Sequence, residues 1–440
     1  MDVRRSSAPL RALASRAAPW RADLGGATAS RSRNWSARTW GAGALVAVGY
    51  MDPGNWATDF EAGSRFGYAL VPVVILASLA GICLQAVAAR LGALSGHDLA
   101  RLCRDHMPRW TRVPMWLASE VAIVACDAAE VVGAALALHL LLGCSLWLGA
   151  LASAFLLLPF AWLQHRGRAW LVAGVMVVMV AVVAMLGVQL GAAWPGGGAV
   201  LDGAAGQADE LGNAGFLWLA AGIVGATIMP HNLYLHSALV TPVAAQAPQR
   251  RSGVLRSIMV ESAAALTLAM GVNLGLLVLA GAVADGAPGS GDELVRMWHR
   301  VNALLPGHLG GTLFALALLG CSLNGMVTTT IAGQVVMEGF LRVRMSLRSR
   351  ALLTRGVAIV PAIIGIVAYG GHSATPVLVA SQVILGLQLP LAVLPMLWFA
   401  GDSRIVRGQR ASTAARVVSW SVAALIVGLD GLLLVQAIAG

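Results

Sequence analysis

Long apolar segments recur along this chain from about residue 41 to its C-terminal end, and short polar connections separate them. A segment of about 20 predominantly apolar residues can cross the hydrocarbon core of a bilayer as an α-helix. The pattern therefore predicts an all-α polytopic membrane protein with eleven transmembrane helices. In chain order, the segments fall at about 41–67, 68–92, 115–142, 144–164, 168–191, 214–240, 257–284, 309–341, 354–371, 375–400 and 416–438.

Composition supports this prediction, because 58% of the 440 residues are hydrophobic and only 11% are charged. A soluble domain is less apolar and more charged. Residues 1–40 differ, being rich in Arg, Ser and Ala with only Asp2 and Asp23 acidic. A disordered cytoplasmic tail is the favoured interpretation of this stretch, with a transit peptide as the alternative. Residues 41–440 are expected to form a single membrane domain.

The basic residues indicate an orientation in the membrane. All thirty are arginine, and 27 of them fall in the tail or in alternate connections, leaving Arg65, Arg296 and Arg300 for the opposite side. Cytoplasmic connections of membrane proteins carry the excess of positive charge. The distribution predicts a cytoplasmic N-terminus and an extracytoplasmic C-terminus. It also accounts for the net charge of +10 without a nucleic-acid partner, since the surrounding partner is the lipid bilayer.

The usual signatures of catalysis are absent from the sequence. The five cysteines form no C-x-x-C pair and lie mostly in apolar runs, so we expect reduced, packed thiols and assign them no role. No H-E-x-x-H or G-x-S-x-G motif occurs, and a Walker P-loop is impossible in a chain without lysine. We therefore expect neither an enzyme nor a bound cofactor.

The apolar segments divide into two blocks of five, at about 41–191 and about 214–400, followed by an extra helix at about 416–438. An odd number of helices per block inverts the second block in the membrane. In transporters built from such inverted repeats, the first helix of each repeat is broken and the substrate binds where the breaks meet. The first and sixth segments should therefore contain matching interruptions.

Two interruptions with the same x-Pro-x-Asn frame occur at these places. They are DPGN, from Asp52 to Asn55, and MPHN, from Met229 to Asn232. Proline lacks a backbone donor and clashes with the preceding turn, so each tetrapeptide should unwind its helix at membrane depth. Freed backbone groups are tolerated there only when they are buried in protein or face water or a ligand. We infer that the chain unwinds to form a site.

The groups at the two breaks suit a divalent metal ion. They are the carboxylate of Asp52, the amide of Asn55, the thioether of Met229 and the freed carbonyls of Gly49 and Ala226. Oxygen ligands alone would suit Mg²⁺ or Ca²⁺, whereas a thioether favours softer first-row ions. The set indicates Mn²⁺, Fe²⁺ or a later transition metal. The alternative is that Met229 only fills an apolar gap, as most methionines in apolar segments do.

The third segment carries Glu120, Asp127 and Glu130 in otherwise apolar sequence. Spacings of seven and three residues place these side chains on one helical stripe. Ionisable residues within a membrane span face the protein interior and often mark a proton or ion path. The alternative is a set of ion pairs that locks the third segment to a neighbour, with Arg355 of the ninth segment as partner.

Two histidines follow the second break. The imidazole of His231 could pass protons or only hydrogen-bond the freed carbonyls, and the residue type does not decide between these roles. We expect His236, five residues further on, to make a packed polar contact.

Four stretches of the sequence resemble the Nramp family of divalent metal transporters, and the likeness covers about 41–438. They are DPGNWATD at 52–59, ALSGHDLARLCRD at 93–105, GATIMPHNLYLHS at 225–237 and AGQVVMEGFL at 332–341. The resemblance implies a LeuT-type fold of eleven helices and proton-coupled import of Mn²⁺ and Fe²⁺. It implies a metal held by Asp52, Asn55, Met229 and the Ala226 carbonyl. Gly49 and Gln382 match the family's additional ligands in other conformations.

The resemblance also implies which residues take part in proton transport. Nramp proteins have acidic residues matching those of the third segment, linked to arginine on the ninth helix, where this chain offers Arg355. The matching histidine, His231, supports proton coupling in the family, and Asp52 is included in the expected proton path. Two departures stand out. Asn324-Gly325 replaces the small hydroxyl residues usual in the eighth helix, and the arginine-rich tail is long.

Two other functions stay open at this point. A sodium- or proton-coupled transporter of amino acids or other organic solutes could have the same fold, because a fold does not choose its substrate. An aspartate beside a thioether is poorly suited to a substrate carboxylate, however. A metal channel or sensor could use the same ligands without alternating access. The expected location is a bacterial inner membrane, with a monomeric transport unit.

Overall fold

The computed structural model describes residues 41–156, 168–206, 210–246, 251–284, 292–343, 345, 347–370 and 373–439. The predicted tail at 1–40 and the second half of the predicted fourth segment lie outside these residues. Every regular element within them is a helix. The first repeat contains α4 (Ala42–Gly49), α5 (Pro53–Phe66), α6 (Val71–Ser95), α7 (Leu99–His106), the short η2 (Arg109–Thr111), α8 (Arg112–Leu142), α9 (Leu146–Leu156) and α11 (Arg168–Ala192).

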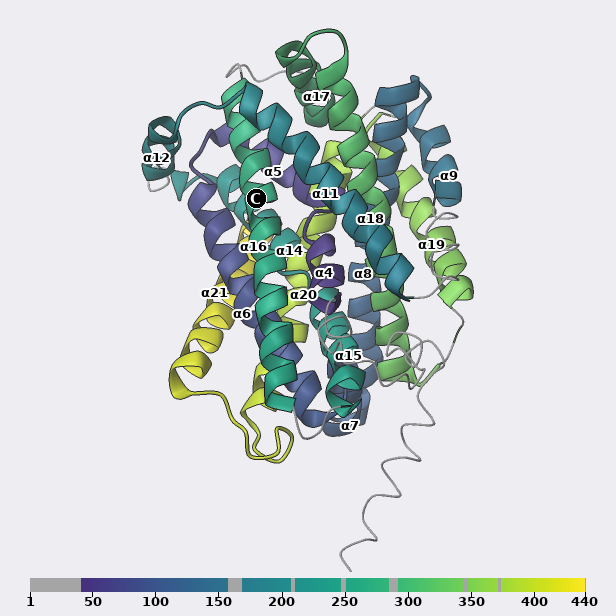
Figure 1. The fold of residues 1–440 in the computed structure, drawn as a ribbon, viewed down its shortest axis with the longest axis vertical. Helices are drawn as coiled ribbons and strands as arrows, with labels where there is room; N and C mark the ends of the chain where they lie inside the picture. The colour runs from purple at the N-terminus through teal and green to yellow at the C-terminus, as the bar shows by residue number, and fades with distance from the viewer. Residues whose placement is uncertain are drawn as a thin grey trace, which may run out of the picture.

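A short helix, α12 (Gly197–Ala205), precedes the second repeat, and the extra helix comes after it. Its elements are α14 (Ala214–Ile228), α15 (Pro230–Gln246), α16 (Arg251–Val283), α17 (Glu293–Leu304), α18 (Leu309–Leu341), α19 (Leu347–Ala368) and α20 (Thr375–Gly401), with α21 (Thr413–Ala439) after them. The long helices form one bundle, with α17 at one end, α7 at the other and α21 at the edge (Figure 1).

Eight stretches of the described chain are helical, long and apolar enough to cross a membrane. They correspond to eight of the eleven predicted segments. The other three correspond to the broken pair α4 and α5, to α9, and to α19. The all-helical membrane architecture is therefore confirmed, while the count of eleven spans stays a prediction. The short helices α7, α12 and α17 were not predicted, because they lie between the long apolar segments.

Both predicted breaks are present. The first helix stops at Gly49 and resumes at Pro53, and the sixth stops at Ile228 and resumes at Pro230. Each proline occupies the first position of its new helix, where its missing N–H is harmless. Met229, between α14 and α15, has a φ of 37°, so the backbone turns sharply there. All residues of α4 are buried, and α16, α18 and α15 pack around it.

Gly225 sets how closely α14 approaches α20 beside the second break. A Cβ atom at this position would overlap the backbone carbonyl oxygen of Gln382 and would approach Gly386. Because the obstructing atoms belong to backbone, no side-chain rotation could relieve the overlap. The absence of a side chain at Gly225 therefore holds Gln382 against the broken helix.

We predict that Gly225→Ala lowers the free energy of unfolding by about 1–3 kcal/mol, the usual cost of overpacking a close contact. The matched control is Gly271→Ala in α16, where an added Cβ would meet no atom within 4 Å. That change should be neutral or slightly stabilising, since alanine favours helix. Thermal unfolding of both variants in one detergent measures the difference. Equal stability of the two would contradict the close-approach role of Gly225.

Candidate functional site

Asp52 lies at the start of α5 as its N-cap residue. One carboxylate oxygen accepts a hydrogen bond from the Asn55 backbone N–H at 2.8 Å, and the other accepts from the side-chain amide of Gln382 at 3.1 Å. Asp52, Asn55 and Gln382 are all buried. The carboxylate therefore sits at the positive end of the α5 dipole, which favours its negative charge, and α20 contributes to the same site.

The two prolines each remove the helical partner of one backbone carbonyl. In a continuous helix the carbonyl of residue i accepts from the N–H of residue i+4. For Gly49 and Ala226 the residue four places on is Pro53 and Pro230, respectively, neither of which has an N–H. The Ala226 oxygen is approached by the Asn55 side-chain amide at 3.5 Å. The geometry thus brings a free carbonyl of the sixth helix to the first.

Met229 is brought into the same region through a shared neighbour. Its side chain packs in a buried apolar cluster with Ala122, Cys126 and Leu385. The Cys126 sulfur in turn lies 3.8 Å from the second oxygen of Asp52. The Met229 sulfur also accepts a hydrogen bond from the Asn232 side-chain amide at 3.4 Å.

The structure connects the predicted metal-site residues to one another by these contacts. Gly49 joins them through Asn232, whose amide nitrogen would lie only 2.5 Å from a Cβ at Gly49. Two buried oxygens at the site, on the side chains of Gln382 and Asn232, have no hydrogen-bond partner among the described residues. Such groups cost about 1–3 kcal/mol when left unsatisfied, so both oxygens are available to a polar or ionic ligand.

The described residues contain no group of three or more His, Cys, Asp or Glu that could hold a metal ion. The donors at the breaks are instead one carboxylate, two amides, backbone carbonyls and a thioether.

Asp127 and Glu130 lie on α8, where this helix packs against α18. The hydroxyl of Thr329 is 2.7 Å from a carboxylate oxygen of Asp127 and 3.0 Å from one of Glu130. Both acids are fully buried. The Cys126 sulfur is also 3.9 Å from the other oxygen of Glu130. A chain of side chains thus runs from Asp52 through Cys126 to Glu130 and Asp127.

Glu120 lies seven residues before Asp127, roughly 10 Å along the helix axis. It forms an ion pair with Arg350 of α19, at 2.6 Å, and accepts a hydrogen bond from the indole N–H of Trp116. Arg350 is 3% exposed, so this ion pair is largely shielded from solvent. An arginine of α19 does pair with Glu120 of the acidic stripe, but it is Arg350, which precedes the predicted ninth segment. The side chain of the predicted partner, Arg355, lies outside the described residues.

His231 and His236 differ in their surroundings. The ring nitrogens of His236 contact Gln85 at 2.9 Å and Ser262 at 3.2 Å, which confirms a packed polar contact. His231 is equally buried, yet neither ring nitrogen has a hydrogen-bond partner in the described part of the chain. The proposed hydrogen bond from His231 to a freed carbonyl is therefore not formed in this conformation.

Cys126, Thr329 and Arg350 were missed by the sequence analysis. Cys126 precedes Glu130 by one helical turn, so its position on the acidic face of the third segment was a usable signal. Thr329 is one of three consecutive threonines, and Arg350 is one of several arginines before the ninth segment. Nothing in the local sequence selects either of them.

Comparisons with known proteins agree with this architecture. Residues 43–436 match the family model described as natural resistance-associated macrophage protein-like, or Nramp. The chain is 43% identical over 392 residues to the divalent metal cation transporter MntH of Xanthomonas campestris pv. campestris, covering 89% of this chain and 88% of that protein.

Two solved structures place the fold. A manganese transporter of Eremococcus coleocola superposes with a TM-score of 0.81 at 31% identity, covering 94% of this chain and 87% of that one. The nucleobase-cation symporter Mhp1 has a TM-score of 0.55 at 16% identity, covering 86% and 80%, and is similar in fold alone. The helical bundle, with its two broken helices facing one another, is thus a LeuT-type transporter fold. Within that class, this chain belongs to the Nramp family.

We predict that Asp52→Asn removes high-affinity divalent metal binding. Asparagine also caps helices, so α5 should still form, and only the negative charge that offsets dehydration of the ion is lost. The dissociation constant for Mn²⁺ should rise about a hundredfold or more, which corresponds to about 3 kcal/mol. Isothermal titration measures it. The control, Glu61→Gln, removes a carboxylate that pairs with Arg65 near the far end of the same helix. Near-normal binding by Asp52→Asn would rule out Asp52 as a ligand.

Proposed function

We propose that this protein is a symporter that imports divalent transition-metal ions such as Mn²⁺ and Fe²⁺ together with protons, by alternating access across a bacterial inner membrane. The observation that carries the proposal is the meeting of two proline breaks at one buried carboxylate. Family membership supports it, as does the metal transport after which the relatives are named. The proposed orientation has the N-terminus in the cytoplasm and the C-terminus outside.

The proposed ligands are Asp52, Asn55, Met229 and the Ala226 carbonyl, with Gly49 and Gln382 contributing in other conformations. Asp52 supplies the charge that offsets loss of the ion's hydration shell, and the neutral donors replace its water ligands. The thioether of Met229 favours softer ions over Ca²⁺ and Mg²⁺. Because each broken helix has two halves that can tilt separately, the ion can face one side of the membrane and then the other.

The proposed proton path begins at Asp52 and follows the acidic stripe of α8. The thiol of Cys126 has one proton and two acceptors, Asp52 and Glu130, at nearly equal distances. The Thr329 hydroxyl likewise has one proton for two carboxyl groups. A proton released from Asp52 when the metal binds would therefore find acceptors already aligned. The ion pair of Glu120 with Arg350 lies further along the same helix, where the path would end.

His231 and Arg355 stay in the proposed proton path. The ring nitrogens of His231, which have no hydrogen-bond partner among the described residues, leave it able to take or give a proton close to the break. Arg355 is included as a further arginine of α19.

Uptake by vesicles tests the proposed function directly. Purified protein in liposomes should take up Mn²⁺ saturably, faster under an inward proton gradient, with simultaneous acidification recorded by an internal pH dye. A channel would give uptake that does not saturate and no linked proton movement. An organic-solute transporter would be revealed by competition from amino acids in metal-free buffer. Either outcome would contradict the proposal.

The acidic stripe generates a prediction about coupling. Glu130→Gln and Asp127→Asn should each reduce metal-driven proton influx at least tenfold while changing Mn²⁺ affinity less than threefold, a difference of about 0.7 kcal/mol. The reason is that both residues lie on α8 rather than at either break. Vesicle acidification and metal titration on the same preparations separate the two effects. Loss of binding with proton dependence intact would show that these acids belong to the metal site.

Met229 generates a prediction about selectivity. Met229→Ala should reduce Mn²⁺ or Cd²⁺ transport modestly and let Ca²⁺ compete about tenfold better, which corresponds to about 1.4 kcal/mol of lost discrimination. The control is Met297→Ala in α17, which removes an equally buried methionine away from the breaks. Both variants should lose stability through a cavity, but only Met229→Ala should change the Ca²⁺ competition curve. An unchanged Ca²⁺ competition curve for Met229→Ala would show that Met229 only packs in the core and does not set selectivity.

A further inference from the structure

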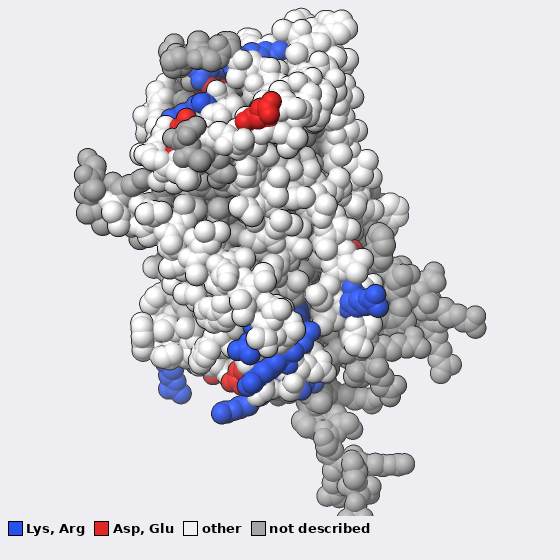
Figure 2. Space-filling view, turned by 90° about the vertical axis from the view of Figure 1, so that its left-hand side faces the viewer, with Lys and Arg blue, Asp and Glu red and all other residues white. Residues whose placement is uncertain are grey.

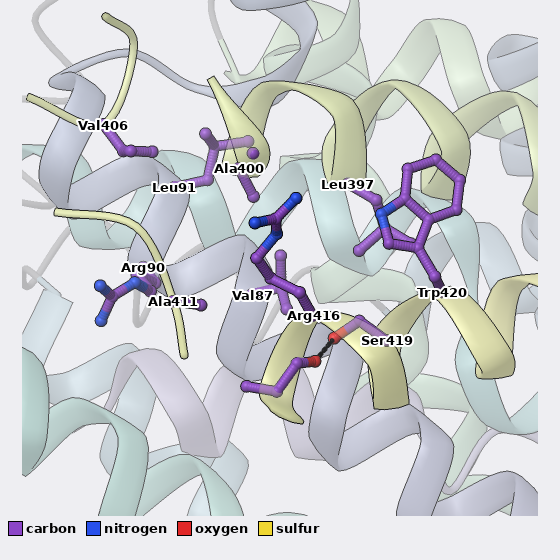
Figure 3. A pocket seen from close by; sticks show the side chains of 12 residues that line it. Val87, Arg90, Leu91, Leu397, Ala400, Val406, Ala411, Arg416, Ser419 and Trp420 are labelled. Carbon is purple, nitrogen blue, oxygen red and sulfur yellow. Dashed lines mark hydrogen bonds between the residues drawn. The ribbon is translucent and has the colours of Figure 1, made fainter. Parts of the chain in front are cut away.

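A pocket lies between α6, α20 and α21, beside the connection that joins α20 to α21, and its volume of about 460 Å³ includes space open to solvent. Its wall is apolar over most of its extent, with Val87, Leu91 and Leu397 among the lining side chains. The lining also includes two arginines, Arg90 and Arg416, with Ser419 and Trp420 (Figure 3). The proposed metal site makes no use of these residues.

Arg416 is one of the two charged residues that line this pocket. In the close view its guanidinium extends between the side chains of Leu91, Ala400 and Leu397 (Figure 3). No carboxylate of the described residues lies within ion-pairing distance of it. Arg90 is committed differently, since its guanidinium donates to the backbone carbonyls of Gln409 at 2.7 Å and Arg410 at 3.2 Å. These hydrogen bonds tie α6 to the connection between α20 and α21.

The connection itself adds positive charge. Arg404, Arg407 and Arg410 are exposed along it, and its one acid, Asp402, accepts a hydrogen bond from the Arg404 backbone N–H at 2.8 Å. With Arg90 and Arg416 these residues form a cluster that we call the arginine patch. On the corresponding side of the molecule, basic side chains gather at the lower end beside a few acidic ones, and others lie at the opposite end (Figure 2).

The pocket lies where protein, lipid chains and headgroups should meet. The adjoining turns of α21 expose Val417, Val418 and Leu425, which are 59%, 53% and 64% exposed. Such apolar faces belong in the hydrocarbon core, whereas Trp420 is a residue type enriched at the membrane interface. The connection at 402–412 is one of the arginine-rich connections assigned to the cytoplasmic side. The pocket should therefore face the inner leaflet at headgroup depth.

We propose that this pocket binds an acidic phospholipid of the inner leaflet, with the phosphate on Arg416 and an acyl chain against the apolar wall. Arginine presents a fork of donors that matches a phosphate group, and basic pockets between transmembrane helices on the cytoplasmic side suit acidic headgroups. The neighbouring arginines disfavour a zwitterionic headgroup, whose cation would face like charge. A lipid seated there joins α6, α20 and α21, so binding stabilises the packing of the extra helix on the repeat core.

Lipid titration of the full chain in a neutral detergent tests the proposal. Native mass spectrometry should detect short-chain phosphatidylglycerol bound to the protein, and this lipid should raise the unfolding temperature. Phosphatidylcholine of equal chain length should do neither. Arg416→Gln should weaken phosphatidylglycerol binding about five- to tenfold, the effect of one arginine near a headgroup. Arg416→Lys keeps the charge without the fork and should lie between the two. Arg109→Gln, a change to an exposed arginine distant from the pocket in sequence, is the matched control.

Three results would overturn the proposal. One is equal binding of the two lipids, and another is unchanged phosphatidylglycerol binding in Arg416→Gln. The third is stabilisation by millimolar inorganic phosphate to the same extent as by lipid, which would make the pocket a free-anion site. Because none of these measurements involves metal or proton transport, their outcome is independent of the proposed function.

Discussion

The missing N–H of proline is the constraint on which this structure depends. Pro53 and Pro230 each stand four residues after a carbonyl that a continuous helix would have satisfied. Within a membrane protein such a carbonyl must find another partner or a ligand. The surrounding helices pack closely around the two breaks. Gly225 lets α20 approach closely enough for Gln382 to reach Asp52, and Asp52 in turn caps α5.

The distribution of charge follows from the same arrangement. One carboxylate, that of Asp52, lies at the break. Two acids of the third helix, Asp127 and Glu130, are linked to it by a thiol and a hydroxyl rather than by direct contact. Separation of this kind allows a metal ion and a proton to use adjoining groups without occupying the same ligand set. The ion pair of Glu120 with Arg350 compensates the charge at the far end of the stripe.

Features that depend on local sequence could be predicted, and features that depend on packing could not. The breaks and the residues beside them follow from proline chemistry and the matching x-Pro-x-Asn frames. The contacts of Asp52 with Cys126, and of Thr329 with the acid pair, need α8 to meet α5 and α18 in one register, which no local pattern specifies. Arg350 was indistinguishable from its neighbouring arginines. The short helices α7 and α17 begin at capping aspartates, Asp98 and Asp292. Long apolar runs do not reveal helices of this kind.

The most direct measurement of the central claim is anomalous scattering from Mn²⁺ in crystals of this protein. The account predicts one strong peak between the two breaks, with the oxygens of Asp52 and Ala226 within roughly 2.6 Å, a distance typical of oxygen ligands to divalent ions. The Met229 sulfur should face the same peak, and crystals of Asp52→Asn should lack it. A peak elsewhere in the bundle, or one that persists in Asp52→Asn, would contradict the claim that the paired breaks build the metal site.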